Sequence, residues 1–174
     1  MSEPIRILGV DPGSRVTGFG IIDAEPQRAR CVVFGCVKTR GQDFAARLKE
    51  IHKAIRSLVS EHRPAEMAIE RVFVHRNPDS ALKLGQARAA ALCATFDANI
   101  TIHEYAAREI KLAIVGSGNA TKEQVQHMVS ALLVLDEKPE SDAADALAAA
   151  ICHAHMHFSR DAWNVAAAFG GRIR

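Results

Sequence analysis

Apolar residues in the first forty positions form short runs or alternate with polar ones, which is typical of β-strands. Between Ile5 and Val10 every position except Arg6 is apolar or glycine, as expected for a strand buried in the middle of a sheet. A Pro-Gly turn follows, and two more strands are predicted at 16–22 and 30–39. The connections are too short for crossover helices, so these three strands should form an antiparallel meander.

Helical spacing replaces this pattern after Asp43, a residue suited to cap a helix. Apolar residues recur at intervals of three and four as far as position 59, and Pro64 ends this helix. The remaining pattern predicts a strand at 65–73, a helix from 79 to about 96, a strand at 100–105, and helices at 106–115, from 121, and at 141–157. We interpret 1–157 as one domain and 158–174 as a C-terminal tail that is a candidate for disorder.

This order of elements indicates an α/β fold, with a mixed five-stranded sheet flanked by helices. If the fourth strand lies beside the first and parallel to it, their carboxyl ends meet at one edge of the sheet. Open α/β sheets bind ligands outside that edge. Asp11 and Glu70, each near the end of its strand, would then lie side by side.

The composition, with 48% hydrophobic and 24% charged residues, is that of an ordinary globular protein. No apolar run approaches the roughly 18 residues of a membrane span, and the N-terminus has no signal-peptide pattern, so we expect a cytoplasmic protein without membrane contact. The four cysteines lack zinc-binding spacing and are expected to be reduced and buried. The net charge is only +2, but a basic surface around an acidic pocket would suit a polyanionic substrate.

The acidic residues at this sheet edge suggest a metal site. Asp142 and Asp145 are three positions apart on the last helix and therefore share a face with each other. Simpler explanations exist, because Asp11 suits a turn and an Asp pair near a helix N-terminus interacts favourably with the helix dipole. If these residues converge with Glu70, they repel one another and raise their pKa values, which divalent cations would relieve. Oxygen ligands suit Mg²⁺ or Mn²⁺, and two such ions about 3.5–4 Å apart can catalyse phosphodiester hydrolysis.

Several segments resemble RuvC, the family of bacterial Holliday-junction resolvases: GVDPGSRVTG (9–18), AIERVF (68–73), DSALKLGQAR (79–88), EYAAR (104–108), QVQHM (124–128) and DAADAL (142–147). The likeness covers nearly the whole chain apart from the tail. It implies an RNase H-like fold, a homodimer that works with the RuvAB branch-migration complex, and Mg²⁺-dependent cutting of two opposed strands of a four-way DNA junction. The family prefers a short thymine-containing sequence, and its four catalytic acids fall on Asp11, Glu70, Asp142 and Asp145.

Residues outside the acidic quartet are candidates for DNA contact. Phe73 precedes a polar turn and could stack on an unpaired base, although its pattern alone favours a place in the core. The resemblance assigns the matching aromatic to the junction centre and gives functional lysines at the positions of Lys111 and Lys122. Lys122 could stabilise charge on the scissile phosphate. The candidates for phosphate contact, each of which could instead be a solvated surface charge, are Arg76, Lys83, Arg108, Lys111 and Lys122.

Small residues on the helix from 79 to 96 include Gly85 and Ala89. They permit close helix approach within the core or across a dimer, and the resemblance favours the dimer, since two symmetric cuts require two related sites. His153, His155 and His157 alternate along the last helix, and we interpret them as exposed or helix-end histidines rather than as a metal site.

Three rival functions stay open at this point. The Asp-x-Gly-Ser hairpin also resembles the phosphate-binding hairpin of actin-like ATPases and sugar kinases, but those proteins need two such domains and this chain is too short for both. An RNase H-like nuclease acting on RNA–DNA hybrids is a second possibility. A non-catalytic junction-binding module is the third, and the intact acidic quartet argues against it. Cleavage assays on a four-way junction, a linear duplex and a hybrid would separate these functions.

Overall fold

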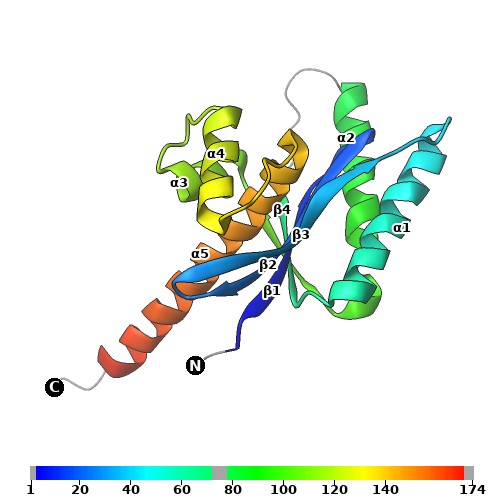
Figure 1. The fold of residues 1–174 in the computed structure, drawn as a ribbon. Coiled ribbons are helices and arrows are strands. Elements are labelled where there is room, and N and C mark those ends of the chain that lie inside the picture. The colour runs from blue at the N-terminus through cyan, green and yellow to red at the C-terminus, as the bar shows by residue number, and fades with distance from the viewer. Residues whose placement is uncertain (1–2, 72–77, 171–174) are drawn as a thin grey trace.

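The computed structural model describes residues 3–71 and 78–170, which are built around a five-stranded sheet (Figure 1). Its strand order is β3-β2-β1-β4-β5. β1, β2 and β3 are antiparallel neighbours, whereas β4 and β5 run parallel to β1. The expected meander and the mixed sheet are therefore confirmed. The strands are β1 (Ile5–Asp11), β2 (Val16–Glu25), β3 (Arg28–Lys38), β4 (Glu66–Glu70) and β5 (Thr101–Tyr105).

Helices cover both faces of this sheet (Figure 1). On one face lie α1 (Phe44–His62) and α2 (Pro78–Cys93), and a short 3-10 helix, Phe96–Ala98, precedes β5. The other face carries α5 (Ser141–Gly170), against which α3 (Ala107–Val115) and α4 (Lys122–Leu133) pack. In the described part of the chain, none of the helices combines the length and the apolar character needed to cross a bilayer.

Local sequence signals account for several of these helix boundaries. The Asp43 carboxylate accepts a hydrogen bond of 2.7 Å from the backbone N–H of Ala46, which caps α1. At the other end, Arg63 takes a left-handed conformation (φ 49°) immediately before Pro64. Thr121 and Gln124 form a reciprocal capping box at the start of α4. These predicted boundaries are confirmed.

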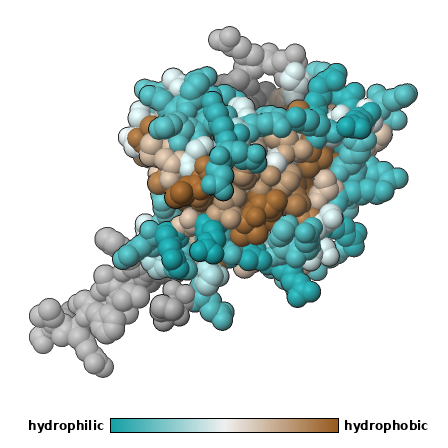
Figure 2. Space-filling view, in the orientation of Figure 1, coloured by the Kyte–Doolittle hydropathy of each residue, from teal (hydrophilic) through white to brown (hydrophobic). Residues whose placement is uncertain are grey.

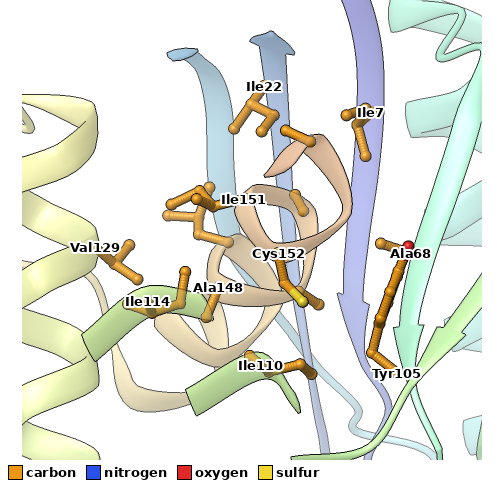
Figure 3. Close-up of a cluster of buried hydrophobic side chains, with 14 of the residues drawn as sticks. Ile7, Ile22, Ala68, Tyr105, Ile110, Ile114, Val129, Ala148, Ile151 and Cys152 are labelled. Carbon is orange, nitrogen blue, oxygen red and sulfur yellow. The ribbon is translucent and has the colours of Figure 1, made fainter. Parts of the chain in front are cut away.

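Two apolar cores result, one on each face of the sheet. Along β1, Leu8 and Val10 are buried against α1 and α2, whereas Ile7 is buried on the α5 face. Figure 3 shows this second core, in which residues of the sheet face α3, α4 and Ile151 of α5. On the side drawn in Figure 2, hydrophilic residues surround an apolar area.

Two expectations about the chain need correction. α5 does not end at His157 but continues to Gly170, so the first part of the expected tail has a helical backbone. The division of the chain at position 157 stays a prediction. All four cysteines are free, as expected, but only Cys152 is buried, and Cys93 is exposed at the end of α2.

Candidate active site

Three elements deliver four carboxylates to one edge of the sheet. Asp11 is the last residue of β1 and Glu70 the last residue of β4. These strands are parallel neighbours in which Val10 pairs with Ile69, so their carboxyl ends coincide as expected. α5 begins at Ser141, which places Asp142 and Asp145 in its first two turns.

Close packing of α5 on the sheet holds its first turns in place. A Cβ atom added at Gly18 of β2 would lie 1.9 Å from the carbonyl oxygen of Asp142, and one added at Gly9 of β1 would lie 2.0 Å from that of Ala146. Neither distance is sterically possible, so only glycine lets the helix backbone approach the strands this closely. The glycines of β1 and β2 therefore fix the end of α5 that carries the two aspartates.

The electrostatics show that the four acids form one coupled group. Burial raises the pKa of Asp11 to about 7, and the negative charges of Asp145, Glu70 and Asp142 add to this effect. The pKa of Glu70 is also raised, first by burial and then by Asp145. Burial likewise raises the pKa of Asp145, with a further contribution from Asp142. Acids whose negative charges oppose a neighbour's ionisation in this way can share divalent cations, which would favour the ionised form.

Two of the predicted basic residues lie at this quartet. The Nζ atom of Lys122 is 3.4 Å from Oδ2 of Asp145, and this carboxylate is the main cause that raises the pKa of the lysine. Lys111 of α3 lowers the pKa values of Glu70 and Asp145 through its positive charge. The Lys122 side chain is 69% exposed, so its ammonium group is accessible to a substrate as well as to the acids.

The other predicted DNA contacts have different surroundings. Lys83 forms an ion pair of 2.6 Å with Asp79 on the exposed side of α2. Arg108, in the first turn of α3, packs its side chain beside Gly118 in the loop that leads to α4. Phe73 and Arg76 lie outside the described residues, so their roles remain predictions.

Sequence reasoning missed a second polar cluster, at the opposite end of β4. His153 is only 2% exposed, and its ring contacts Glu66 and the hydroxyl group of Tyr105, so its interpretation as an exposed histidine is wrong. Burial lowers the pKa of His153, against the opposing effect of its hydrogen bond with Glu66. His153 and His157 are four positions apart and do share a helix face, which was the signal available in the sequence.

Comparison with known proteins gives a consistent family assignment. The family model described as "Crossover junction endodeoxyribonuclease RuvC" matches residues 7–153. A protein of that name from Marinobacter nauticus is 54% identical over 153 residues, which are 88% of this chain and 87% of the relative. Another, from Aromatoleum aromaticum, is 50% identical over 169 residues, which are 97% of this chain and 89% of the relative.

Solved structures agree with the sequence relatives. The structure entitled "T. thermophilus RuvC in complex with Holliday junction substrate" superposes with a TM-score of 0.83 at 34% identity, covering 90% of this chain and 96% of its own. The yeast mitochondrial Holliday junction resolvase Ydc2 has a TM-score of 0.70 over 97% of this chain and 86% of its own. Its identity is 11%, so it supports the fold alone. The expected RNase H-like architecture is thereby confirmed, and the chain belongs to the RuvC family of crossover junction endodeoxyribonucleases.

Proposed function

We propose that this protein resolves four-way DNA junctions by hydrolysing two opposed phosphodiester bonds, with two divalent metal ions at each active site. The observation that carries this proposal is the coupled quartet of carboxylates, in which the pKa of Asp11 is raised to about 7. Such a group is unfavourable in a metal-free protein and favourable around cations. The relatives, which are named as crossover junction endodeoxyribonucleases and include a RuvC bound to Holliday junction substrate, supply the substrate class.

The donor atoms of the quartet fit Mg²⁺ or Mn²⁺. Asp11, Glu70, Asp142 and Asp145 offer only hard carboxylate oxygens, which these ions prefer over softer donors. When bound, a pair of ions would activate the attacking water and stabilise the charge on the leaving oxygen. The protein contributes the placement of the four carboxylates, which the strand ends and the closely packed α5 determine.

Lys122 is the best candidate for a protein group that acts directly on the scissile phosphate. Its ammonium group lies beside Asp145, and the Lys122 side chain is largely exposed. A DNA phosphate bound over the quartet could therefore be contacted by this group. A positive charge at this position would stabilise the extra negative charge that develops in the transition state. Lys111 lies close enough to influence Glu70 and Asp145 and would contribute to phosphate binding more diffusely. Lys83 and Arg108 are proposed as peripheral phosphate contacts.

A homodimer packed through α2 would supply the second active site that paired cutting requires. Leu82 is 67% exposed on this helix, and a Cβ atom added at Gly85 would meet nothing within 4 Å. Within one protomer, therefore, nothing in the packing of Gly85 requires its small size. Ala89, one turn further on, is also exposed. Leu82, Gly85 and Ala89 therefore form a stripe on α2 against which the α2 helix of a second protomer could pack closely. Cooperation with the RuvAB branch-migration complex is expected from the family alone.

The decisive experiment is a cleavage assay on a synthetic four-way junction in Mg²⁺, with a linear duplex and an RNA–DNA hybrid of the same sequence as competing substrates. We expect paired, symmetric cuts in the junction and little cutting of the other two. The Asp11→Asn variant should bind the junction without cutting it. Preferential cutting of the hybrid would instead indicate the RNase H-like alternative, and binding without cleavage by the unaltered protein would indicate a non-catalytic module.

A further inference from the structure

A cluster of nitrogen and oxygen ligands lies between β4, β5 and α5, at the end of β4 that is far from the quartet. Its members are Glu66, the first residue of β4, His103 of β5 and His153 of α5. One ligand atom from each lies within 4.8 Å of the other two. Because Glu66 and Glu70 are at opposite ends of the same short strand, this cluster is distinct from the catalytic acids.

The carboxylate of Glu66 is the centre of the cluster. Its Oε2 atom contacts Nε2 of His153 and lies 3.3 Å from Nε2 of His103. The rings of these two histidines stack with their centroids 4.1 Å apart. On the other side, Nδ1 of His157 lies 3.6 Å from Oε1 of Glu66. Three imidazoles from two elements thus surround one partly buried carboxylate.

Hydrogen bonding does not account for every group in this cluster. His153 is satisfied, since its Nε2 atom meets Glu66 and its Nδ1 atom lies 2.6 Å from the Tyr105 hydroxyl. Nε2 of His103 is buried and has no hydrogen-bond partner among the described residues, although it is aimed at the same carboxylate. Buried polar atoms nearly always have a partner, so this nitrogen requires an explanation. A cation between the imidazoles and the carboxylate would give it one.

We propose that Glu66, His103 and His153 bind a transition-metal ion, with zinc as the best match. Two imidazole nitrogens and one carboxylate oxygen are a ligand set that Zn²⁺ accepts. Tetrahedral zinc with bonds of about 2.0–2.2 Å separates neighbouring ligand atoms by about 3.3–3.6 Å. The distance of 3.3 Å between His103 and Glu66 already falls in this range. His153 would move slightly away from Glu66, and His157 is within reach of the fourth position.

Tyr105 provides the outer support that metal-binding histidines usually have. A histidine that ligates through Nε2 carries its proton on Nδ1 and donates it to a nearby acceptor, which fixes the ring. The hydroxyl oxygen of Tyr105 is such an acceptor, 2.6 Å from Nδ1 of His153 in a buried setting. A hydroxyl group can donate or accept, so the same pair satisfies His153 with and without the metal.

The ion would have a structural role rather than a catalytic one. Asp145 and His153 are eight positions apart on α5, which corresponds to about 12 Å along the helix axis and is too far for contact with the quartet. Bound at this point, however, the ion joins β4, β5 and α5, and two of these elements carry catalytic acids. It would therefore hold β4 and α5 in their mutual positions.

The test is zinc binding by protein without an affinity tag, measured by calorimetry and thermal melting. Excess Mg²⁺ is present throughout to occupy the carboxylate quartet. At a zinc concentration of 100 times Kd, we expect the melting temperature of the unaltered protein to rise by about 5–10 °C. Glu66→Gln and His103→Gln should lose this rise. His155→Gln is the matched control, since His155 is exposed on the same helix, and this variant should retain the rise.

A second measurement needs no variant, so it remains informative if the substitutions impair folding. Co²⁺ in a tetrahedral site with imidazole ligands absorbs visible light much more strongly than Co²⁺ in an octahedral all-oxygen site. We expect the strong spectrum at one equivalent of Co²⁺ in excess Mg²⁺, and its loss when Zn²⁺ is added. A weak octahedral spectrum, or zinc binding that persists unchanged in His103→Gln, would overturn the proposal. Neither experiment uses DNA, so its outcome is independent of the proposed junction cleavage.

Discussion

Replacing Asp11 with asparagine should abolish cleavage and yet stabilise the metal-free protein above pH 7. Asparagine has nearly the same size as a protonated aspartate but cannot ionise. The Asp11 carboxyl group would ordinarily ionise near 3.8, whereas burial and the three neighbouring acids raise its pKa to about 7. Between these pH values the folded protein holds a proton that the unfolded chain has released. Stability therefore falls as the pH rises from about 4 to about 7, and it stays low at higher pH.

The size of this effect follows from the pKa shift. At 1.4 kcal/mol for each tenfold change in proton affinity, a rise from 3.8 to about 7 corresponds to at most about 4 kcal/mol at pH 8. The carboxylates are partly accessible to water and can move apart, so we expect a measured gain of about 2–4 kcal/mol for the variant. At pH 5 the folded wild-type side chain is still protonated, but the unfolded chain has already released its proton, so the gain should fall to roughly two-fifths of its value at pH 8.

Urea unfolding in EDTA at pH 5 and pH 8 measures both values. Mg²⁺ should stabilise the wild-type protein more than Asp11→Asn, because the variant lacks one anionic ligand. Asp136→Asn, which changes an exposed aspartate in the turn after α4, is the control for nonspecific charge effects. A variant less stable than wild type at pH 8, or a stability difference that is the same at both pH values, would refute the coupled-quartet reasoning.

Substitutions at four further positions test other parts of the protein. Gly18→Ala places a Cβ atom 1.9 Å from the carbonyl oxygen of Asp142, so the start of α5 must move away from the sheet. A movement of about 1 Å or more should slow single-turnover cleavage by about 100-fold. Circular dichroism checks that the variant is folded. Lys122→Gln should reduce the cleavage rate by about 10- to 1000-fold and weaken junction binding much less, as measured by single-turnover kinetics and gel shift. Phe73→Ala should lower the rate of junction cleavage about 10- to 100-fold, because a lost stacking contact costs about 1–3 kcal/mol, whereas Phe73→Trp should retain more activity. If thermal melts show instead that Phe73→Ala lowers the stability of the protein by about 3–5 kcal/mol, Phe73 lies in the core. Leu82→Glu should convert a dimer of about twice 18.9 kDa into monomers in sedimentation experiments, and an unchanged mass would exclude the α2 interface.

The strand order and the acidic quartet could be predicted because they depend on chain connectivity. Short connections force β1, β2 and β3 into a meander, and a helix between β3 and β4 permits β4 to lie parallel to β1. Asp11 and Glu70, at the ends of these parallel neighbours, then lie side by side, and this does not depend on how the side chains of the core pack. The spacing of Asp142 and Asp145 guarantees that they share a helix face, and the resemblance to RuvC identified that face as the one directed at the sheet edge.

Features that depend on three-dimensional packing were not predictable in this way. The role of Gly18 comes from a carbonyl group more than 120 positions away in the chain, and no local pattern marks that approach. The cluster at Glu66 was missed because its members come from three elements and two of them, His103 and His153, contact each other only after folding. The end of α5 was misplaced at His157 because the Gly-Gly-Arg end of the chain suggested a tail from position 158, although apolar residues continue at helical spacing from Phe158 to Phe169.

The lack of side chains at Gly9 and Gly18, where the strands face α5, also determines which parts of this nuclease can be redesigned. At these positions the sheet meets chiefly main-chain atoms of α5, which are the same for every amino acid, joined at Gly9 by the Cβ atom of Ala150. Exchanging Asp142 or Asp145 for a residue with other donor atoms would therefore change the chemistry offered to a metal without removing the contacts that locate the helix. The two strand glycines, in contrast, should tolerate almost no variation in a library selected for activity. Metal preference can thus be varied on α5, whereas the geometry of the site is encoded in β1 and β2.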